Sequence, residues 1–330
     1  MRIMARPRAL IAVLSACLLL AGCGSAPSQV GAAAFFDDHE IVTIDQVQSM
    51  IDKSVQEQPA ARQLAQQHKL DQVGREAVRQ LVLHELITRT AQQDGVSVDP
   101  NQVAQVLAQD PLAAPLSTNT VDPSQLPAQI VYRVRDHREV ITDQLLLQSL
   151  GKQYFDKLAI TFDYTSVVTD DGGANPVTMR EKAFAKVGQM AADPDAAAKV
   201  IQADAAAGAK TSLGERVPAV QAPDFAGTVL FGVPPGTVVA FQPSAERAVW
   251  IVAVVRARDL GAQQSVDQAT SPTMGQLAAI GLRLLQPRLD QLGLKINPRY
   301  GVWDPTALNL AASAAETTGL VLSVKGTPQP

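Results

Sequence analysis

The sequence has few cysteines, few aromatic residues and no excess of basic charge. Two cysteines in 330 residues are too few for a disulfide-built scaffold or a four-cysteine zinc site. The formal net charge of −4 argues against nonspecific nucleic-acid binding, which needs a strongly basic surface. The chain is 46% hydrophobic, too apolar for a mostly disordered protein and too polar for one with many membrane spans. Its length favours two domains.

Motifs that hold nucleotides, metals or catalytic serines are also missing. The sequence contains no phosphate loop, Gly-x-Gly-x-x-Gly, Gly-x-Ser-x-Gly or His-Glu-x-x-His pattern. No two of the four histidines have a metal-ligand spacing, and the acidic pairs at 37–38 and 170–171 fit solvated turns better than calcium sites. We therefore expect no metal, no cofactor and no nucleotide. His84 and His137 lie near apolar helical stripes, so we expect both to be half-buried structural residues.

The first 22 residues have the organisation of an export signal. Arginines at positions 2, 6 and 8 precede an uncharged stretch at 9–22. That stretch is too short to cross a bilayer, which takes about 20 residues of helix. The pattern predicts a signal peptide at 1–22.

The signal ends in Leu-Ala-Gly-Cys at 20–23, which resembles the lipobox of bacterial lipoproteins. The resemblance implies cleavage before Cys23 and acylation of its thiol and new amine. Residues 23–31 would then form a lipidated tether, since they are small and polar. More than one acyl chain gives stable anchoring. We therefore expect an extracytoplasmic protein of the cell envelope, anchored to the cell membrane as a lipoprotein.

Composition divides the rest of the chain near residue 155 into a helical part and a more β-like part. Residues 32–158 begin with a short hairpin that turns at 37–38. Thr43 and Gln46 then form a capping-box pattern at the start of a helix. Further helices are expected at about 72–93 and after Asp99, followed by a loop at 110–127 and one long helix that Gly151 ends.

The middle and end of the chain follow different patterns. Residues 159–258 predict a β-α-α-β-β unit, with strands near 160–168, 237–241 and 248–256 and helices at 178–192 and 194–207. Residues 259–330 predict a helix that Ser271-Pro272 starts and Pro287 kinks or splits, a short strand at 294–296 and a poorly ordered tail. The fold class predicted is α+β.

The hairpin and helix from Ala33 to Val47, followed by the helix at 75–93, resemble the N-terminal domain of the SurA/PrsA group. These are extracytoplasmic chaperones, some with peptidyl-prolyl isomerase activity. In that group, parvulin-type isomerase domains interrupt a helical chaperone domain, and a C-terminal helix returns to complete it. The resemblance implies the same order here, with a chaperone domain at 32–158, a parvulin-like domain at 159–258 and the returning helix within 259–330.

The middle unit resembles a degenerate parvulin domain through three stretches, which are 164–168, 222–225 and 248–252. By this resemblance, the two histidine positions of the family fall at Ser166 and Trp250. No histidine follows residue 137, so no small realignment restores either one. The sequence therefore lacks the paired histidines of the family's polar network, and we favour a domain that does not catalyse.

Some apolar residues of the degenerate domain could still line a peptide pocket. The resemblance implies four peptide-binding residues, Phe225, Phe231, Val238 and Trp250. Plain packing in the core of the domain is the other interpretation of all four. We assign no catalytic residue from the sequence. Ser166 and Asp224 are the two candidates for a chemical role.

The function expected from the resemblance is that of a membrane-anchored, ATP-independent chaperone or foldase. Its partners would be unfolded or newly exported polypeptides, held in apolar grooves between the helical and parvulin-like domains, and the membrane through the lipid on Cys23. Two alternatives remain open at this point. One is an active peptidyl-prolyl cis-trans isomerase that uses an unusual network, and the other is a non-catalytic scaffold lipoprotein with one envelope partner.

The lipobox interpretation makes a direct prediction. Cys23→Ala should leave the precursor unprocessed, or release the protein from the detergent phase, because no residue would then carry the lipid. Phase partitioning of wild type and variant measures the change. A mature protein whose Cys23 is unmodified by mass spectrometry would contradict the prediction.

Overall fold

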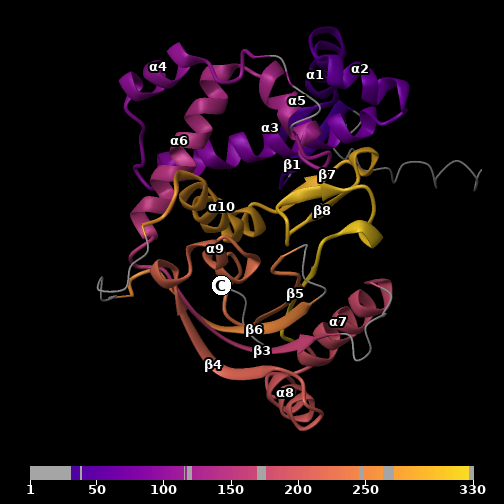
Figure 1. Ribbon diagram of the computed structural model, residues 1–330, viewed down its shortest axis with the longest axis vertical. Helices are drawn as coiled ribbons and strands as arrows, with labels where there is room; N and C mark the ends of the chain where they lie inside the picture. The colour runs from indigo at the N-terminus through magenta and orange to yellow at the C-terminus, as the bar shows by residue number, and fades with distance from the viewer. Residues whose placement is uncertain are drawn as a thin grey trace, which may run out of the picture.

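We describe the protein from a computed structural model. Its fold is α+β, with both helices and strands (Figure 1). A helical part with a small three-stranded sheet lies beside a five-stranded antiparallel sheet, and the C-terminal segment contacts both. The structure describes residues 31–37, 39–114, 116, 121–168, 176–244, 249–262 and 271–326. The expected signal peptide, Cys23 and nearly all of the tether lie outside the described residues.

The chain enters the helical part through a hairpin and a capping box. Strands β1 (Ala32–Phe36) and β2 (His39–Thr43) pair antiparallel, and Asp37 has the positive φ that the tight turn needs. Thr43 Oγ1 accepts from the Gln46 amide at 3.0 Å, and Gln46 Oε1 accepts from the Thr43 amide at 2.8 Å. The predicted capping box at the start of α1 (Ile44–Glu57) is therefore confirmed.

Helix α3 (Leu70–Gln93) has buried residues along most of its length, and α2 (Pro59–Gln66), α5 (Leu126–Val134) and α6 (His137–Tyr154) pack against it. Helix α4 (Pro100–Gln109) packs on α6 instead. Asp99 caps α4 as expected, by accepting from the Asn101 amide at 2.8 Å. The single long helix expected after residue 127 is wrong, because Arg135 is extended and Asp136 caps a second helix.

The larger sheet has the order β10-β5-β6-β3-β4, with every neighbouring pair antiparallel. Its strands are β3 (Ala159–Val167), β4 (Thr211–Pro218), β5 (Thr237–Phe241), β6 (Trp250–Asp259) and β10 (Leu320–Ser323). Helices α7 (Pro176–Met190) and α8 (Ala196–Ala206) cover one face. The other face carries α9 (Pro223–Ala226) and the 3-10 turns η2 (Ala219–Gln221) and η3 (Val229–Phe231).

Two strands of this sheet were not expected from the sequence. The predicted β-α-α-β-β order lacks β4, an edge strand in which four of the eight residues are exposed. Gly214 within it adopts a φ of +66°, and its amide donates to buried Asp163 on β3 at 2.7 Å. The other addition is β10, which pairs with β5 from the far end of the chain.

The C-terminal segment returns to the helical part. Helix α10 (Met274–Gln291) begins at Thr273, which forms a capping box with Gln276, so the start expected at Ser271-Pro272 is wrong. Pro287 lies inside α10 without splitting it. The expected strand β7 (Leu294–Ile296) is confirmed, and it pairs with β1 to give the sheet order β2-β1-β7.

The tail after β7 is organised around the buried carboxylate of Asp304. The expectation of a poorly ordered tail is wrong for the described residues up to 326, which form turns and short strands. Asp304 accepts hydrogen bonds from the Thr306 amide and from the amide and hydroxyl of Thr318. These bonds hold the turn that leads into β10. The elements here are η5 (Pro298–Tyr300), β8 (Val302–Asp304), β9 (Asn309–Ala311) and η6 (Ala314–Glu316).

Helix α10 contributes to the cores of both units. Leu285 and Leu289 pack in the helical core, whereas Ile280 packs with the sheet and α9. The guanidinium of buried Arg283 donates to the carbonyl oxygens of Gly227 and Thr306, each at 2.8 Å. Residues 259–330 therefore contribute to the helical core, as the returning helix was expected to do, and also to the core of the sheet unit.

Helices α6 and α10 cross at two glycines. A Cβ atom on Gly151 would overlap the backbone carbonyl of Leu277, and one on Gly281 would overlap the carbonyl of Leu147. Only glycine allows so close an approach of two helix backbones. Gly151 was expected to end its helix, but α6 continues to Tyr154 and the glycine serves this contact instead.

No helix in the part of the chain that the structure describes has both the length and the apolar character needed to cross a membrane.

The helix crossing makes a prediction about stability. Gly281→Ala should lower the free energy of unfolding by about 2 kcal/mol or more, because the added methyl group forces two packed backbones apart. Gly188→Ala is the matched control, since that glycine is exposed within α7 and a Cβ there meets nothing within 4 Å. The control should be neutral or stabilising by up to about 1 kcal/mol. Urea unfolding followed by circular dichroism measures both, and equal effects would contradict the account.

Candidate functional site

An apolar cavity of about 610 Å³ opens in the helical part, where α3, α4, α6 and α10 face one another. Its walls are mainly aliphatic. They include Leu83, Ile87, Val106, Ile141, Leu147 and Leu282. A cavity of this size falls within the usual range for ligand sites, about 300–1,000 Å³. We call this cavity the helical groove.

The spacing of residues along each helix explains these walls. Leu83 and Ile87 are four residues apart on α3, and Ala278 and Leu282 are four apart on α10. Residues at this spacing lie on one face of a helix, so each helix presents a stripe to the groove. Helix α4 is held over α6 by a small cluster centred on Val103, which places Val106 at the groove.

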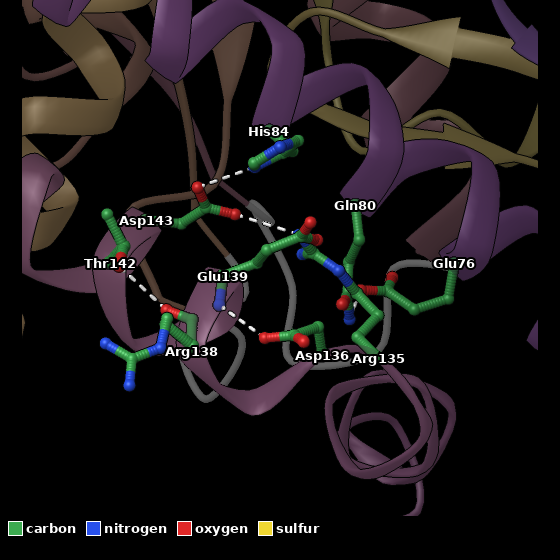
Figure 2. A network of polar contacts seen from close by, with 9 residues as sticks. All are labelled: Glu76, Gln80, His84, Arg135, Asp136, Arg138, Glu139, Thr142 and Asp143. Carbon is green, nitrogen blue, oxygen red and sulfur yellow. Dashed lines mark hydrogen bonds and ion pairs between the residues drawn. The ribbon is translucent and has the colours of Figure 1, made fainter. Parts of the chain in front are cut away.

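One side of the groove carries a chain of ion pairs between α3 and α6, which Figure 2 shows from close by. Nδ1 of His84 lies 2.8 Å from Oδ1 of Asp143. Oδ2 of the same carboxylate accepts from Nη2 of Arg135 at 3.0 Å. All three residues line the groove. Asp143 therefore lies between two groups that can carry positive charge.

Arg135 and Asp143 form a buried pair, with side chains 4% and 10% exposed. Glu139 is farther from the guanidinium, at 3.8 Å, and its side chain is mostly in solvent. Removal of one member of a buried pair leaves an uncompensated charge, so such pairs are costly to break. Asp136 also fixes this corner, since its side chain accepts from the Glu139 amide at 3.1 Å and caps α6.

A second polar group extends the rim along α3. The Gln80 side-chain amide donates to Glu76 at 2.9 Å and to the Ala128 carbonyl at 3.2 Å. Arg79 donates to Glu76 and to the Leu308 carbonyl, each at 2.9 Å. These bonds link α3 to α5 and to the C-terminal tail, so the polar side of the groove is rigidly held.

The carboxylate of Asp143 raises the pKa of His84 above its ordinary value of 6.5. The hydrogen bond between the two side chains is the main cause, and partial burial of the ring opposes it. The nearby guanidinium of Arg135 also opposes it. The protonated imidazole is therefore favoured in the folded protein to a higher pH than in the unfolded chain.

The four residues expected to bind peptide lie on two faces of the larger sheet. Phe225 and Phe231 pack on the face that carries α9, with ring centroids 5.9 Å apart. Val238 and Trp250 pack on the opposite face, against α7 and α8. The structure therefore does not bring the four together in one pocket. Phe231 and Val238 are fully buried, and only Phe225 is half-buried.

Trp250 contacts an aromatic residue of α7 and also lines a second cavity. Its ring makes an edge contact with Phe184 of α7, with centroids 5.6 Å apart. It also lines a separate cavity of about 560 Å³, together with Arg180, Phe241 and Arg283. This cavity lies between the sheet and the C-terminal tail and shares no residue with the helical groove.

The two candidates for a chemical role are not joined to each other. The Ser166 hydroxyl is buried in β3 and has no hydrogen-bond partner. Asp224 lies exposed at the start of α9, where it accepts from the Gln276 side chain of α10 at 2.7 Å. Among the described residues, no group of three or more His, Cys, Asp or Glu side chains could hold a metal ion.

The helical groove was not found from the sequence. The apolar stripes of its helices were visible, but they predict packed faces and do not reveal where four faces leave a space between them. His84 was expected to be a half-buried structural residue, which agrees with its partly buried ion pair. Its partner Asp143 is 59 residues away, so no local pattern joins them.

The chain matches no protein-family model, no curated protein and no solved structure.

The ion pair of His84 predicts how stability depends on pH. Because folding raises the pKa of His84, the pair stabilises the protein fully below about pH 6.5 and is lost as pH rises through the folded-state pKa. The cost of His84→Gln in the free energy of unfolding should therefore be larger at about pH 5.5 than at about pH 9, by an amount on the order of 1 kcal/mol or less.

Urea unfolding at both pH values measures this difference. His68→Gln is the control for the replacement of an exposed histidine. A larger cost for His84→Gln at the higher pH would show that the sign is wrong.

Proposed function

We propose that this protein is an ATP-independent chaperone for exported polypeptides and that the helical groove holds apolar segments of its clients. The observation that carries the proposal is the aliphatic groove itself, with a polar network along one side. Unfolded chains expose aliphatic side chains, and covering these removes apolar surface from water. A binder of this kind needs no nucleotide.

The composition of the groove suits broad recognition. Most of its lining is aliphatic, and Tyr132 is the one Phe, Tyr or Trp among the described residues that line it. Aliphatic walls favour apolar side chains without requiring one shape, whereas a few fixed polar groups orient what is bound. The firmly bonded Arg79 and Gln80 fix α3 to the C-terminal tail and to α5, which holds the α3 wall of the groove in place.

The arrangement of the chain supports a likeness to the SurA/PrsA group. The sheet of residues 159–259 lies between two stretches of the helical part in sequence, and α10 and β7 return to α6 and β1. Four of its strands have the order β5-β6-β3-β4, with α7 and α8 on one face and α9 on the other. In this proposal the parvulin-like unit is a second body beside the groove.

The proposal locates client binding differently from the expectation made from the sequence. None of the described residues of 159–262 lines the helical groove, so the proposed binding site lies within the helical part and not between the two units. The proposed anchor is unchanged. A lipid on Cys23 would hold the protein at the membrane, facing newly exported chains.

Isomerase activity has no specific support among the described residues. The expected pocket residues are divided between two faces of the sheet, and Ser166 has no polar partner that could orient it. Stabilisation of a twisted amide needs preorganised polar groups aimed at it. We therefore propose that the parvulin-like unit does not catalyse.

The groove predicts a charge-sensitive binding surface. Val106→Asp should weaken binding of an unfolded client by roughly tenfold. A carboxylate would replace an apolar side chain of the wall, and its contact with the client contributes about 1.4 kcal/mol to the free energy of binding. Leu107→Asp is the matched control, since Leu107 is the next residue of α4 and packs on the same small cluster but does not line the groove. Suppression of aggregation of a chemically unfolded protein measures both variants.

Equal losses in the two variants would contradict a role for the groove. A proline-peptide assay on the wild-type protein distinguishes the enzyme alternative, and we expect no acceleration. Pulldown after membrane solubilisation distinguishes the chaperone from a scaffold lipoprotein. A single captured partner, together with no suppression of aggregation, would favour the scaffold.

A further inference from the structure

His84 is placed where any occupant of the helical groove would cover it. Its side chain is 31% exposed, and the residue lines the groove together with aliphatic side chains. Its other face is committed to Asp143 on α6. The ring therefore lies between an ion pair inside the protein and water in the groove.

The charge balance of this network depends on the proton of His84. Asp143 is already neutralised by Arg135, whose side chain is 4% exposed. Protonation of His84 therefore adds a net positive charge to the side of the groove, and Glu139 is too far into solvent to offset it fully. Water in the groove solvates that extra charge.

The other elements that pack around His84 supply few charges. The lining residues on α4 and α10 are uncharged, and they include Gln102, Val106, Ala279 and Leu282. On α3, Gln80 is neutral and Arg79 is paired with Glu76. Among the described residues, no carboxylate besides Asp143 lines the groove, so none can replace the water that an apolar occupant would displace.

We propose that capture of an apolar segment in the helical groove releases a proton from His84, so that the groove binds such segments more tightly as pH rises. This inference rests on the proposed function, because it concerns the same groove. An apolar occupant removes water from the imidazolium, and removal of water disfavours the charged form of the ring more than the neutral form. The neutral ring can still donate from Nδ1 to Asp143, so the network survives loss of the proton.

Linkage fixes the direction of the effect. The pKa of His84 is raised above 6.5 in the free protein, and covering the ring lowers it. Affinity is then highest where the free protein has already lost the proton, and it falls as pH drops through the free-state pKa. The fall is about tenfold for each unit by which covering lowers the pKa. By reciprocity, binding at intermediate pH must release protons.

The test uses the full-length mature protein and a blocked peptide of Leu, Ile, Ala and Ser, which has no ionisable group. Titration calorimetry at several pH values, in buffers of different protonation enthalpy, gives the affinity and the number of protons released. We expect affinity to rise several-fold from about pH 5.5 to about pH 8.5, with proton release near the middle of that range.

Two variants assign the proton. His84→Gln should bind with an affinity that does not change with pH, because glutamine keeps a donor for Asp143 but does not titrate. His137→Gln is the matched control, since His137 also pairs with a carboxylate, Asp110, at 2.8 Å but does not line the groove. The control should keep the wild-type dependence on pH.

A second measurement needs no variant. The pKa of His84, followed by NMR of its ring protons, should fall when the wild-type protein is saturated with the peptide. Binding that is independent of pH, or a pKa that stays the same or rises on saturation, overturns the coupling but leaves the proposed function intact. Failure of the wild-type protein to bind the peptide at any pH overturns both.

Discussion

The close contact between α6 and α10 is the constraint on which the rest of the structure depends. Leu147 and Leu277 present backbone carbonyls to the positions where Gly281 and Gly151 lack a side chain, so the two helices approach each other at both points. This contact brings the C-terminal helix into the helical part. It also sets the width of the groove, because Leu147 and Ala278 line it from the two sides of the crossing.

The same helix joins the groove to the sheet. Arg283 of α10 is buried and donates to Gly227 beside α9 and to Thr306 in the tail, and burial lowers its pKa to about 10. A buried guanidinium with all of these bonds made is costly to displace. Helix α10 is therefore one of the connections between the helical part and the sheet, the C-terminal tail being another, so a change in the sheet unit can reach the groove through α10.

Local signals in the sequence predicted local structure well. The capping box at Thr43 and the strand at 294–296 follow from nearby residues alone, and both are present. Strand β4 escaped prediction because an edge strand is exposed and shows no apolar alternation. The groove and the pair of His84 with Asp143 escaped because they depend on how distant helices meet, which no short pattern records.

The central claim is that unfolded chains bind in the helical groove, and site-specific photo-crosslinking tests it most directly. A photoreactive residue is placed at Gln144, which is exposed and lines the groove, or at Gln189, which is exposed on α7 away from it. Each protein is irradiated with a chemically unfolded client. The account predicts strong crosslinks from position 144 and weak ones from position 189. Equal crosslinking from both positions, or none from position 144, would contradict it.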